Sequence, residues 1–448
     1  MIELLQRAVD AHAASTAVVT DDASLTFVDV LRLSTAMAGG LRQRGIGRLA
    51  VVDPDAATAV IAFAASSAVG TEVCQYPADI SSEAAAELAG RLDHTTVLTR
   101  REDLSFAETF TLDELLVEGA ELPPLPESRP LMVLTSGTTG GSRGVLHDWN
   151  RVVSGMLGIR PSPGERWLLA YGLHQFGGLQ VLMHAAAACA TLVAPTPRRP
   201  REGLAAMRKY GVTHASATPT FWRFVLTQMR ADGEPVPELR QVTLGGEAVP
   251  DRLLRDLHGA FPAANISQIY GSTESGNPRS TRDGRPGLPL SALDAGEDAD
   301  IQLKIVDGEL WVRSKIGMLG YYDDPTLDSN GWRATGDQVE VVGDRILFRG
   351  RRSEVVNVGG VKVHPFAVEE RVLAVPGVEI ARVFGRPNPL SGAIVAVEAV
   401  VAPGVDPEQV KNQIREACAD LPGASRPRSI RIVDELKTAG NKIARGMS

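Results

Sequence analysis

The sequence predicts an α/β protein with a large N-terminal domain of stacked sheet-and-helix layers and a small α+β C-terminal domain. Residues 2–92 alternate helical stretches with short β-rich runs, which is typical of a parallel sheet covered by helices. The alternation resumes over residues 148–260, whereas residues 287–348 hold short β runs separated by Gly and Asp turns. A chain of 448 residues is long enough for two or three domains.

The first layer contains an interruption before its last strand. The short apolar run Leu49–Val52 predicts a buried strand in this layer. The Pro-rich run Pro123–Pro130 then breaks the alternation and precedes another buried-strand run that begins at Leu131. Small residues that cannot continue a strand follow directly, so we expect this strand to feed a flexible loop.

The second layer and the β-rich segment have clearer patterns. In the second layer we expect helices near Trp149–Leu157, Gly178–Ala188 and Thr220–Arg230, and a strand at Val242–Gly246. The runs IQLKIV, ELWVRS, VEVVG and RILFRG predict an antiparallel sheet or a small β-barrel-like subdomain at about residues 285–350. The remaining residues could fold alone. The predicted domains are therefore residues 1–350 and residues 351–448.

Charge and cysteine content exclude several classes of protein. The chain has 46 Lys and Arg against 54 Asp and Glu, a net charge of -8 that disfavours a nucleic-acid partner. Cys74, Cys189 and Cys418 lie far apart and form no C-x-x-C pair, so neither a zinc site nor a secreted disulfide framework is expected.

The hydropathy pattern predicts no membrane span and no export signal. The most apolar stretch, Val181–Ala194, is shorter than the roughly 20 residues that a bilayer requires. Near the N-terminus, Glu3 and Asp10 stand where a secretory signal would be basic and then apolar. We therefore expect a cytoplasmic protein.

The segment LTSGTTGGSRGV, Leu134–Val145, is the densest functional signal. It places glycines and hydroxyls in a loop after a strand and ends near a cation, Arg143. Such a loop offers backbone N–H groups, hydroxyls and positive charge to a polyphosphate. The spacing matches neither a Walker loop nor a G-x-G-x-x-G dinucleotide motif.

This segment and five others, in this order, resemble the motifs of the adenylate-forming superfamily, which includes acyl-CoA synthetases, aryl-CoA ligases and the adenylation domains of peptide synthetases. The other five are GGEAV (Gly245–Val249), YGSTES (Tyr270–Ser275), TGD (Thr335–Asp337), FRGRRSEVVNVGGVKVHP (Phe348–Pro365) and LKTAGNKIAR (Leu436–Arg445). The resemblance implies an enzyme that forms an acyl-AMP from a carboxylic acid and ATP, with Mg²⁺, and then a thioester with CoA. It also implies that the small C-terminal domain is mobile and rotates between the two half-reactions.

The resemblance implies a role for each matching residue. Tyr270 would stack on adenine, Asp337 would accept the ribose hydroxyls with help from Arg351, and Lys442 would bridge the substrate carboxylate and the α-phosphate. The implied ATP- or AMP-binding residues are Thr135, Ser136, Gly137, Thr138, Thr139, Gly140, Gly246, Glu247, Ala248, Tyr270, Gly271, Ser272, Thr273, Asp337, Arg351 and Lys442. The implied catalytic residues are Lys442, Glu274, His174 and Arg143, with Glu274 and Thr138 as magnesium ligands.

Two positions depart from the family pattern. Arg143 stands where the family usually has a lysine, and an arginine can still clamp phosphates. Ser353 stands at the hinge, where an aspartate is common.

By the same resemblance, Gly359 and Gly360 would let the pantetheine arm of CoA approach the acyl-adenylate, which a Cβ would obstruct.

The expected acid is aromatic or otherwise ring-bearing. Residues 170–179 contain His174 but lack the aspartate with which amino-acid adenylation domains hold the substrate ammonium. The candidate acid-pocket residues are His174, Phe176, Gly177, Gly245, Gly271 and Gly276. Many glycines suit a flat ring placed between backbones.

Several alternatives stay open. A free-standing acyl carrier protein or an amine could take the acyl group in place of CoA, and a homodimer also stays open. A nucleotide-binding sensor without catalysis is the alternative from another class, for which Ser353 and Arg143 are the only support. The presence of Lys442, Glu274 and Asp337 argues against it.

Overall fold

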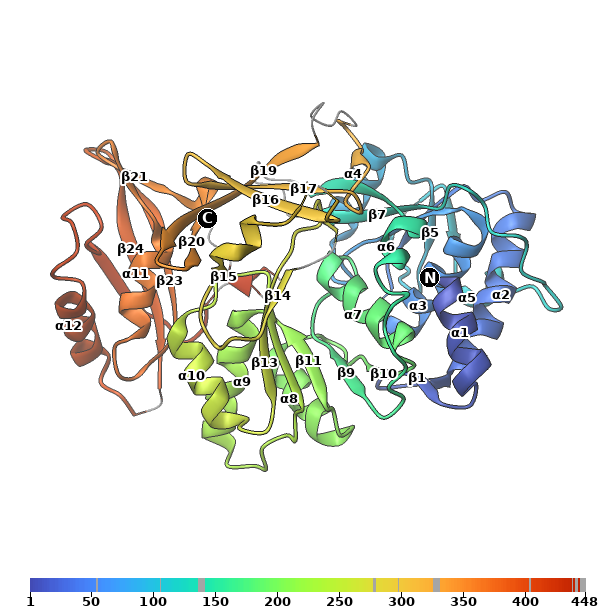
Figure 1. The fold of residues 1–448 in the computed structure, drawn as a ribbon, viewed down its shortest axis with the longest axis horizontal. Coiled ribbons are helices and arrows are strands. Elements are labelled where there is room, and N and C mark those ends of the chain that lie inside the picture. Colours follow the sequence, from blue (N-terminus) through green and yellow to red (C-terminus); the bar gives the residue numbers. More distant parts are fainter. Residues whose placement is uncertain are drawn as a thin grey trace.

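The computed structural model describes residues 1–53, 55–104, 106–135, 142–276, 279–296, 298–324, 331–402, 404–436, 438–439 and 442–443. Figure 1 shows a chain that passes from α/β layers at the N-terminal end to a separate small unit at the C-terminal end. The predicted fold class is confirmed: a large N-terminal α/β region is followed by a small C-terminal unit. In the described part of the chain, no helix has both the length and the apolar character needed to cross a membrane.

The first layer is a seven-stranded sheet in the order β18-β8-β7-β4-β3-β5-β6. Strands β7, β4, β3, β5 and β6 are parallel neighbours, and β8 and β18 extend the sheet in antiparallel pairing. The strands are β3 (Arg48–Val51), β4 (Glu72–Gln75), β5 (Thr96–Leu98), β6 (Glu108–Phe110), β7 (Pro130–Thr135), β8 (Arg143–Asp148) and β18 (Gly320–Tyr321). The predicted strand at Leu49–Val52 and the predicted strand before the phosphate loop are thus β3 and β7.

The second layer is an eight-stranded sheet in the order β14-β13-β12-β11-β9-β10-β1-β2. Its six inner strands are parallel, and only the two edge strands are antiparallel to their neighbours. The strands are β1 (Thr16–Val19), β2 (Ser24–Thr26), β9 (Arg166–Leu169), β10 (Thr191–Val193), β11 (His214–Ala217), β12 (Gln241–Gly245), β13 (Asn265–Tyr270) and β14 (Arg279–Thr281). The predicted strand at Val242–Gly246 is β12.

Helices cover both sheets and fill the space between them. Helix α3 is buried on almost every side, so its continuous run of Ala, Val, Ile and Phe forms part of the main core instead of an amphipathic surface. The helices are α1 (Ile2–His12), α2 (Phe27–Gln43), α3 (Ala56–Val69), α4 (Ser82–Leu92), α5 (Leu112–Leu115), α6 (Trp149–Ser154), α7 (Phe176–Ala187), α8 (Pro200–Lys209), α9 (Pro219–Asp232) and α10 (Asp251–Ala260). The three predicted helices of the second layer are α6, α7 and α9, with slightly shifted ends.

The β-rich subdomain is a five-stranded antiparallel sheet in the order β15-β20-β19-β17-β16. Its strands are β15 (Leu288–Pro289), β16 (Ile301–Val306), β17 (Glu309–Ser314), β19 (Trp332–Val342) and β20 (Arg345–Arg351), with a 3₁₀ turn at Leu290–Leu293. Within the described residues β15 and β16 are the two edges, so the subdomain is an open sheet and not a closed barrel. The predicted domain boundary after Gly350 falls one residue before β20 ends.

The C-terminal unit has its own sheet and core. Its strands are β21 (Val356–Val358), β22 (Val361–Val363), β23 (Val378–Asn388), β24 (Gly392–Val401) and β25 (Ser429–Ile432), its helices are α11 (Pro365–Leu373) and α12 (Pro407–Ala417), and a 3₁₀ turn precedes them at Arg352–Glu354. Valines from β21 to β24 and from α11 form the core. The chain ends its described part in a small hairpin of β26 (Thr438–Ala439) and β27 (Lys442–Ile443).

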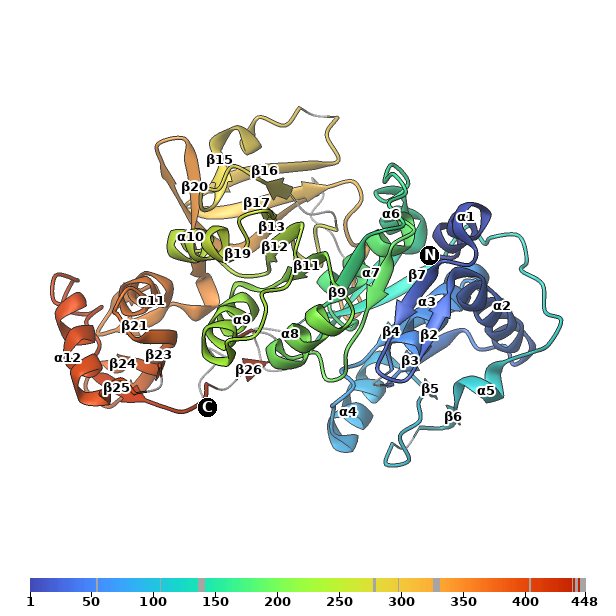
Figure 2. The same ribbon diagram turned by 90° about the horizontal axis from the view of Figure 1, so that it is seen from below.

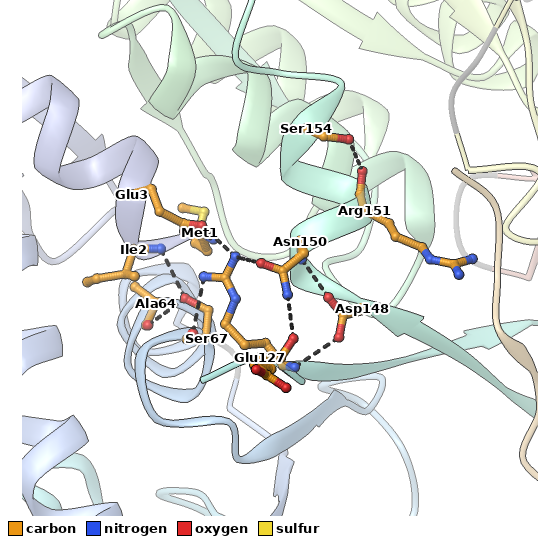
Figure 3. Close-up of polar contacts among 11 residues, drawn as sticks. Met1, Ile2, Glu3, Ala64, Ser67, Glu127, Asp148, Asn150, Arg151 and Ser154 are labelled. Atoms are coloured by element: carbon orange, nitrogen blue, oxygen red, sulfur yellow. Dashed lines mark hydrogen bonds and ion pairs between the residues drawn. The ribbon is translucent and has the colours of Figure 1, made fainter. Parts of the chain in front are cut away.

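The base of the β7–β8 hairpin is fixed by a buried arginine, Arg129. Its partners Glu3, Asn150 and Asp148 are labelled in Figure 3. Arg129 is 1% exposed, and its guanidinium donates to Glu3 of α1 at 2.5 Å and to Asn150 of α6 at 2.6 Å. A weaker bond at 3.4 Å reaches the carbonyl of Ser67 in α3. The Arg129 backbone N–H donates to Asp148 at the end of β8. One side chain thus joins three helices to the hairpin that carries the predicted phosphate loop.

We expect Arg129→Met to destabilise the large domain by about 3 kcal/mol, because it leaves the Glu3 carboxylate without its buried partner. Burial alone would raise the pKa of Glu3, but the Arg129 hydrogen bond and the nearby N-terminal ammonium outweigh it and lower the pKa to about 2. Thermal unfolding at pH 7 measures the loss. The control is Arg255→Met, which removes an exposed ion pair with Asp251 and should cost less than about 1 kcal/mol. Equal melting temperatures for the two variants would contradict this assignment.

Candidate active site

Parallel strands of one sheet bring several predicted residues to the same edge. The carboxyl ends of β9, β12 and β13 lie at one edge of the eight-stranded sheet, and the loops that follow carry His174, Glu247 and the segment from Gly271 onward. In open α/β sheets, ligands bind outside the carboxyl ends of the strands. The topology therefore places motifs that are far apart in sequence around one region.

Tyr270, Asp337 and Arg351 meet where this edge contacts the β-rich subdomain. The Tyr270 hydroxyl donates to Asp337 Oδ2 at 2.9 Å, and Arg351 Nε lies 3.2 Å from Asp337 Oδ1. Asp337 and Arg351 are directly paired in the β19–β20 ladder. Burial raises the pKa of Tyr270 well above its usual range, so its hydroxyl stays protonated and donates to the carboxylate.

The ring of Tyr270 is stacked on a residue that the sequence did not single out for a role. Phe348 of β20 lies with its ring centroid 4.8 Å from that of Tyr270, at an interplanar angle of 23°. This stacking covers one face of the tyrosine ring. A flat base that stacks on Tyr270 must therefore use the other face.

The segment Gly246–Ala248 lies between β12 and helix α10 and contacts the start of helix α9. Gly246 has a φ of +82°, a conformation that glycine adopts without strain. Glu247 turns back and accepts a hydrogen bond from the Thr220 backbone N–H in the first turn of α9, at 2.9 Å. The carboxylate of Glu247 therefore fixes the start of a helix at this edge.

The loop from Gly271 to Gly276 is held against the β-rich subdomain. The Met318 N–H donates to the Glu274 carbonyl at 3.0 Å, and the Ser314 hydroxyl donates to the Ser275 carbonyl at 2.7 Å. Gly276 has a φ of +80°, and a Cβ there would stand 2.5 Å from the Ile316 carbonyl oxygen. Close backbone approach therefore explains this glycine, whose part in an acid pocket stays a prediction.

A tyrosine connects Glu274 with Arg143. The Tyr321 hydroxyl donates to Glu274 Oε1 at 3.0 Å, and the Arg143 guanidinium lies 3.6 Å from the centre of the Tyr321 ring. Arg143 also forms an ion pair with Asp323 at 3.0 Å. Arg143 is thus already engaged by two partners. Tyr321 and Asp323 were not predicted from the sequence, because their contacts join segments about 180 residues apart.

A cavity of about 370 Å³ opens beside this cluster. It is lined by Ser272, Glu274, Trp311, Val312, Met318, Tyr321, Asp324, Trp332, Arg333, Ala334 and Thr335. No group of three or more His, Cys, Asp or Glu that could hold a metal occurs among the described residues. Mg²⁺ in nucleotide sites commonly takes one or two carboxylates and completes its shell with phosphate oxygens and water. A single carboxylate, Glu274, therefore fits a magnesium ion that arrives with a nucleotide.

Two of the predicted acid-pocket glycines, Gly177 and Gly245, lie beside Tyr171. A Cβ on Gly177 would lie 3.4 Å from the Tyr171 ring, and one on Gly245 would lie 3.3 Å from its hydroxyl. The pKa of His174 is lowered to about 4, chiefly because burial disfavours the charged ring and secondarily because Arg198 is near. His174 is therefore neutral at pH 7.

Phe176 is stacked on a buried histidine of the first layer. The ring centroids of Phe176 and His147 are 5.1 Å apart at an interplanar angle of 19°. His147 is the next-to-last residue of β8, and Phe176 is the first residue of α7. The contact joins the predicted acid segment to the strand that carries the phosphate loop.

Some predicted residues are only partly described or lie elsewhere. Ser136, Gly137, Thr138, Thr139 and Gly140 lie outside the described residues, and Thr135 is the last residue of β7. Lys442 is placed by its backbone in β27, which lies beside α9; Figure 2 shows the hairpin near this helix. Gly359 and Gly360 form the turn between β21 and β22 of the C-terminal unit.

Comparison with known proteins gives two family matches that together cover most of the chain. The model of the AMP-binding enzyme family matches residues 5–322, and that of the AMP-binding enzyme C-terminal domain matches residues 367–442. The chain belongs to the AMP-binding enzyme family. The predicted membership of the adenylate-forming superfamily is therefore confirmed.

Two curated relatives and one solved structure are similar to this chain. A 2-succinylbenzoate–CoA ligase of Bacillus velezensis is 30% identical over 374 residues, which is 77% of this chain and 74% of that protein. A 4-chlorobenzoate–CoA ligase of an Arthrobacter species is 27% identical over 77% of this chain and 71% of its own. The crystal structure of the anthranilate CoA ligase AuaEII with anthranoyl-AMP matches with a TM-score of 0.86 and 22% identity, covering 99% of this chain and 95% of that one.

We expect acid to destabilise this AMP-binding enzyme partly through His147. Burial lowers its pKa to about 4 in the folded protein, against about 6.5 when unfolded. Between pH 6.5 and pH 4 the unfolded chain therefore binds a proton at this position that the folded protein does not, so its contribution to stability is complete above pH 6.5 and is lost as the pH falls toward 4. The free energy of unfolding should fall by about 2 kcal/mol between pH 7 and pH 5 for this reason.

His147→Phe should therefore reduce the drop in melting temperature between pH 7 and pH 5, because a phenyl ring takes up no proton. His258→Gln, at an exposed position on α10, is the control and should keep the wild-type drop. A His147→Phe protein with the full wild-type drop would exclude His147 as the source.

Proposed function

We propose that this chain joins a ring-bearing carboxylic acid to coenzyme A in two half-reactions at one site. In the first, the acid attacks ATP to give an acyl-AMP and pyrophosphate; in the second, the thiol of CoA displaces AMP. The chain is an acid–thiol ligase of the AMP-forming kind. ATP and CoA are its co-substrates, and Mg²⁺ is its metal ion. The observation that carries this proposal is the meeting of Tyr270, Asp337 and Arg351 beside Glu274.

The nucleoside half of ATP would bind at Tyr270 and Asp337. Adenine would stack on the face of Tyr270 that Phe348 leaves free, beside the Gly246–Ala248 segment. The ribose hydroxyls would donate to Asp337, which is paired with Arg351. The Tyr270 hydroxyl already occupies one oxygen of Asp337, so the side chain is oriented before the nucleotide arrives.

The first half-reaction brings two anions together, and the chain supplies groups that reduce their repulsion. The carboxylate oxygen of the acid attacks the α-phosphorus, and the bond to the β-phosphate oxygen breaks with release of pyrophosphate. Glu274 would hold Mg²⁺, which when bound neutralises charge on the phosphates. Tyr321 donates to one oxygen of Glu274 and fixes its orientation. Lys442 would bridge the acid carboxylate and the α-phosphate.

The acceptor step would use the C-terminal domain in a rotated position. Gly359 and Gly360 have φ values of +58° and +88°, and a Cβ on either would meet no atom within 4 Å. The turn therefore offers an exposed backbone surface along which a pantetheine arm could pass. Ser353, at the expected hinge, lies in the short 3₁₀ turn between β20 and β21.

The acid is proposed to be aromatic. His174 is neutral and partly buried, and the pocket segment from Ala170 to Leu179 contains no carboxylate that would hold an ammonium group. The relatives named for 2-succinylbenzoate, 4-chlorobenzoate and anthranilate all act on acids that carry a benzene ring. An aryl acid therefore fits both the chemistry of the segment and the similarity.

A panel of acids tests this proposal directly. With ATP and Mg²⁺ but no acceptor, we expect pyrophosphate release with aryl acids and little with fatty or α-amino acids. Addition of CoA to the reactive acid should then give the thioester. Release driven by α-amino acids, or transfer only to a carrier protein or an amine, would contradict the proposed substrate or the proposed acceptor, respectively.

Lys442→Ala separates the two half-reactions. Because the lysine acts while charge moves onto the phosphates, its loss should lower the rate of adenylation by about a hundred- to a thousandfold. Thioester formation from pre-made acyl-AMP should be much less affected. The measurement is single-turnover pyrophosphate release beside acyl transfer from the pre-made adenylate. Equal loss in both assays would remove Lys442 from the adenylation step.

A further inference from the structure

A second arginine lies beside Glu274 and Tyr321. Arg333, the second residue of β19, lines the 370 Å³ cavity together with both. It is partly buried, and within the part of the chain that the structure describes its guanidinium has no hydrogen bond and no direct ion pair, although Tyr321 and Glu274 attract its charge. Burial outweighs this attraction and lowers the pKa of Arg333, so the charged guanidinium is compensated only in part unless an anion occupies the adjoining cavity.

Arg143 provides an informative contrast. It lies over the Tyr321 ring and pairs with Asp323, so its charge is already compensated by the protein. Arg333 lies near the same tyrosine and lines the cavity. Of these two arginines, Arg333 has the capacity to accept a new anionic partner. Its guanidinium can form two parallel hydrogen bonds with phosphate oxygens, which a lysine cannot.

The order of two segments indicates which anion would reach Arg333. Strand β13 ends at Tyr270, and the loop that follows it contains Glu274. In β19, Arg333 is near the start of the strand and Asp337 lies four residues further along. Tyr270 and Asp337 are joined at one end by a hydrogen bond, while Glu274 and Arg333 share the cavity at the other. A nucleotide with its ribose on Asp337 would therefore extend its phosphates toward Glu274 and Arg333.

We propose that Arg333 binds the terminal phosphates of ATP and stabilises the pyrophosphate that leaves. This inference rests on the proposed function, because it needs ATP at the same site. When the acid oxygen bonds to the α-phosphorus, the α–β bridging bond breaks and its electron pair goes to the pyrophosphate oxygen. Arg333 is placed to neutralise the charge that develops there, and no proton transfer from the arginine is required.

The first test is nucleotide binding, which needs no knowledge of the acid. Calorimetric titration compares ATP with Mg²⁺ against AMP for the wild type, Arg333→Met and Arg333→Lys. We expect Arg333→Met to weaken ATP binding by about tenfold or more and AMP binding by less than about twofold. Arg333→Lys should fall between the two. Lys315→Met, which removes an exposed charge bonded to the Asp298 carbonyl of the same subdomain, is the matched control.

The second test is the reverse reaction, in which acyl-AMP and pyrophosphate form ATP. Arg333→Met should raise the KM for pyrophosphate and lower adenylation about a hundredfold, while acyl transfer from pre-made acyl-AMP to CoA stays near the wild-type rate. An Arg333→Met protein that keeps the wild-type preference for ATP over AMP would overturn the proposal. So would an equal loss of AMP affinity, which would assign Arg333 a structural role. A wild type that binds neither nucleotide would instead reject the proposed function.

Discussion

The hydrogen bond from Tyr270 to Asp337 is the interaction on which the arrangement of the site depends. Tyr270 ends the last parallel strand of the large sheet, and Asp337 lies in the central strand of the β-rich subdomain. Arg351, at the end of β20, completes the contact directly before the chain enters the C-terminal unit. One carboxylate therefore orients the large sheet, the subdomain and the start of the predicted hinge relative to one another. A nucleotide that binds Asp337 contacts the point where these parts meet.

The fold could be predicted well from the sequence because its signals are local. Alternating helical and β-rich runs identified both layers, and the strand before the phosphate loop and helices α6, α7 and α9 were found within a few residues of their ends. For the β-rich subdomain the sequence left an antiparallel sheet and a small barrel-like form open, because short β runs with Gly and Asp turns fit both, and the described strands form the sheet. Closure depends on which edge strands pair, and no local pattern encodes that pairing.

The candidate site was predictable only where a motif carried it. Tyr270, Asp337 and Arg351 belong to separate motifs: Tyr270 ends a strand of the parallel sheet, whereas Asp337 and Arg351 are paired in the antiparallel β19–β20 ladder that contacts it. Tyr321 and Arg333 have no such signal. The ring of Tyr321 packs against Arg143, and Arg333 lines the cavity beside Glu274, and both contacts depend on the folded structure. Likewise, the sequence suggested open space around Gly177 and Gly245, but Tyr171 fills part of it. Side-chain packing across long separations decides these details.

The glycines at residues 359–360 can be explained either by the conformation of the turn or by the passage of a ligand. A two-residue hairpin turn with positive φ at both positions favours glycine whether or not a ligand passes. The Asn357 side chain also accepts a hydrogen bond from the Gly360 N–H, which fixes the turn locally. These glycines therefore do not by themselves identify CoA as the acceptor. Arg333 differs in this respect, since no local backbone requirement explains a partly buried cation that lines a cavity. A partly buried charge that the fold compensates only in part is the stronger indication of a ligand.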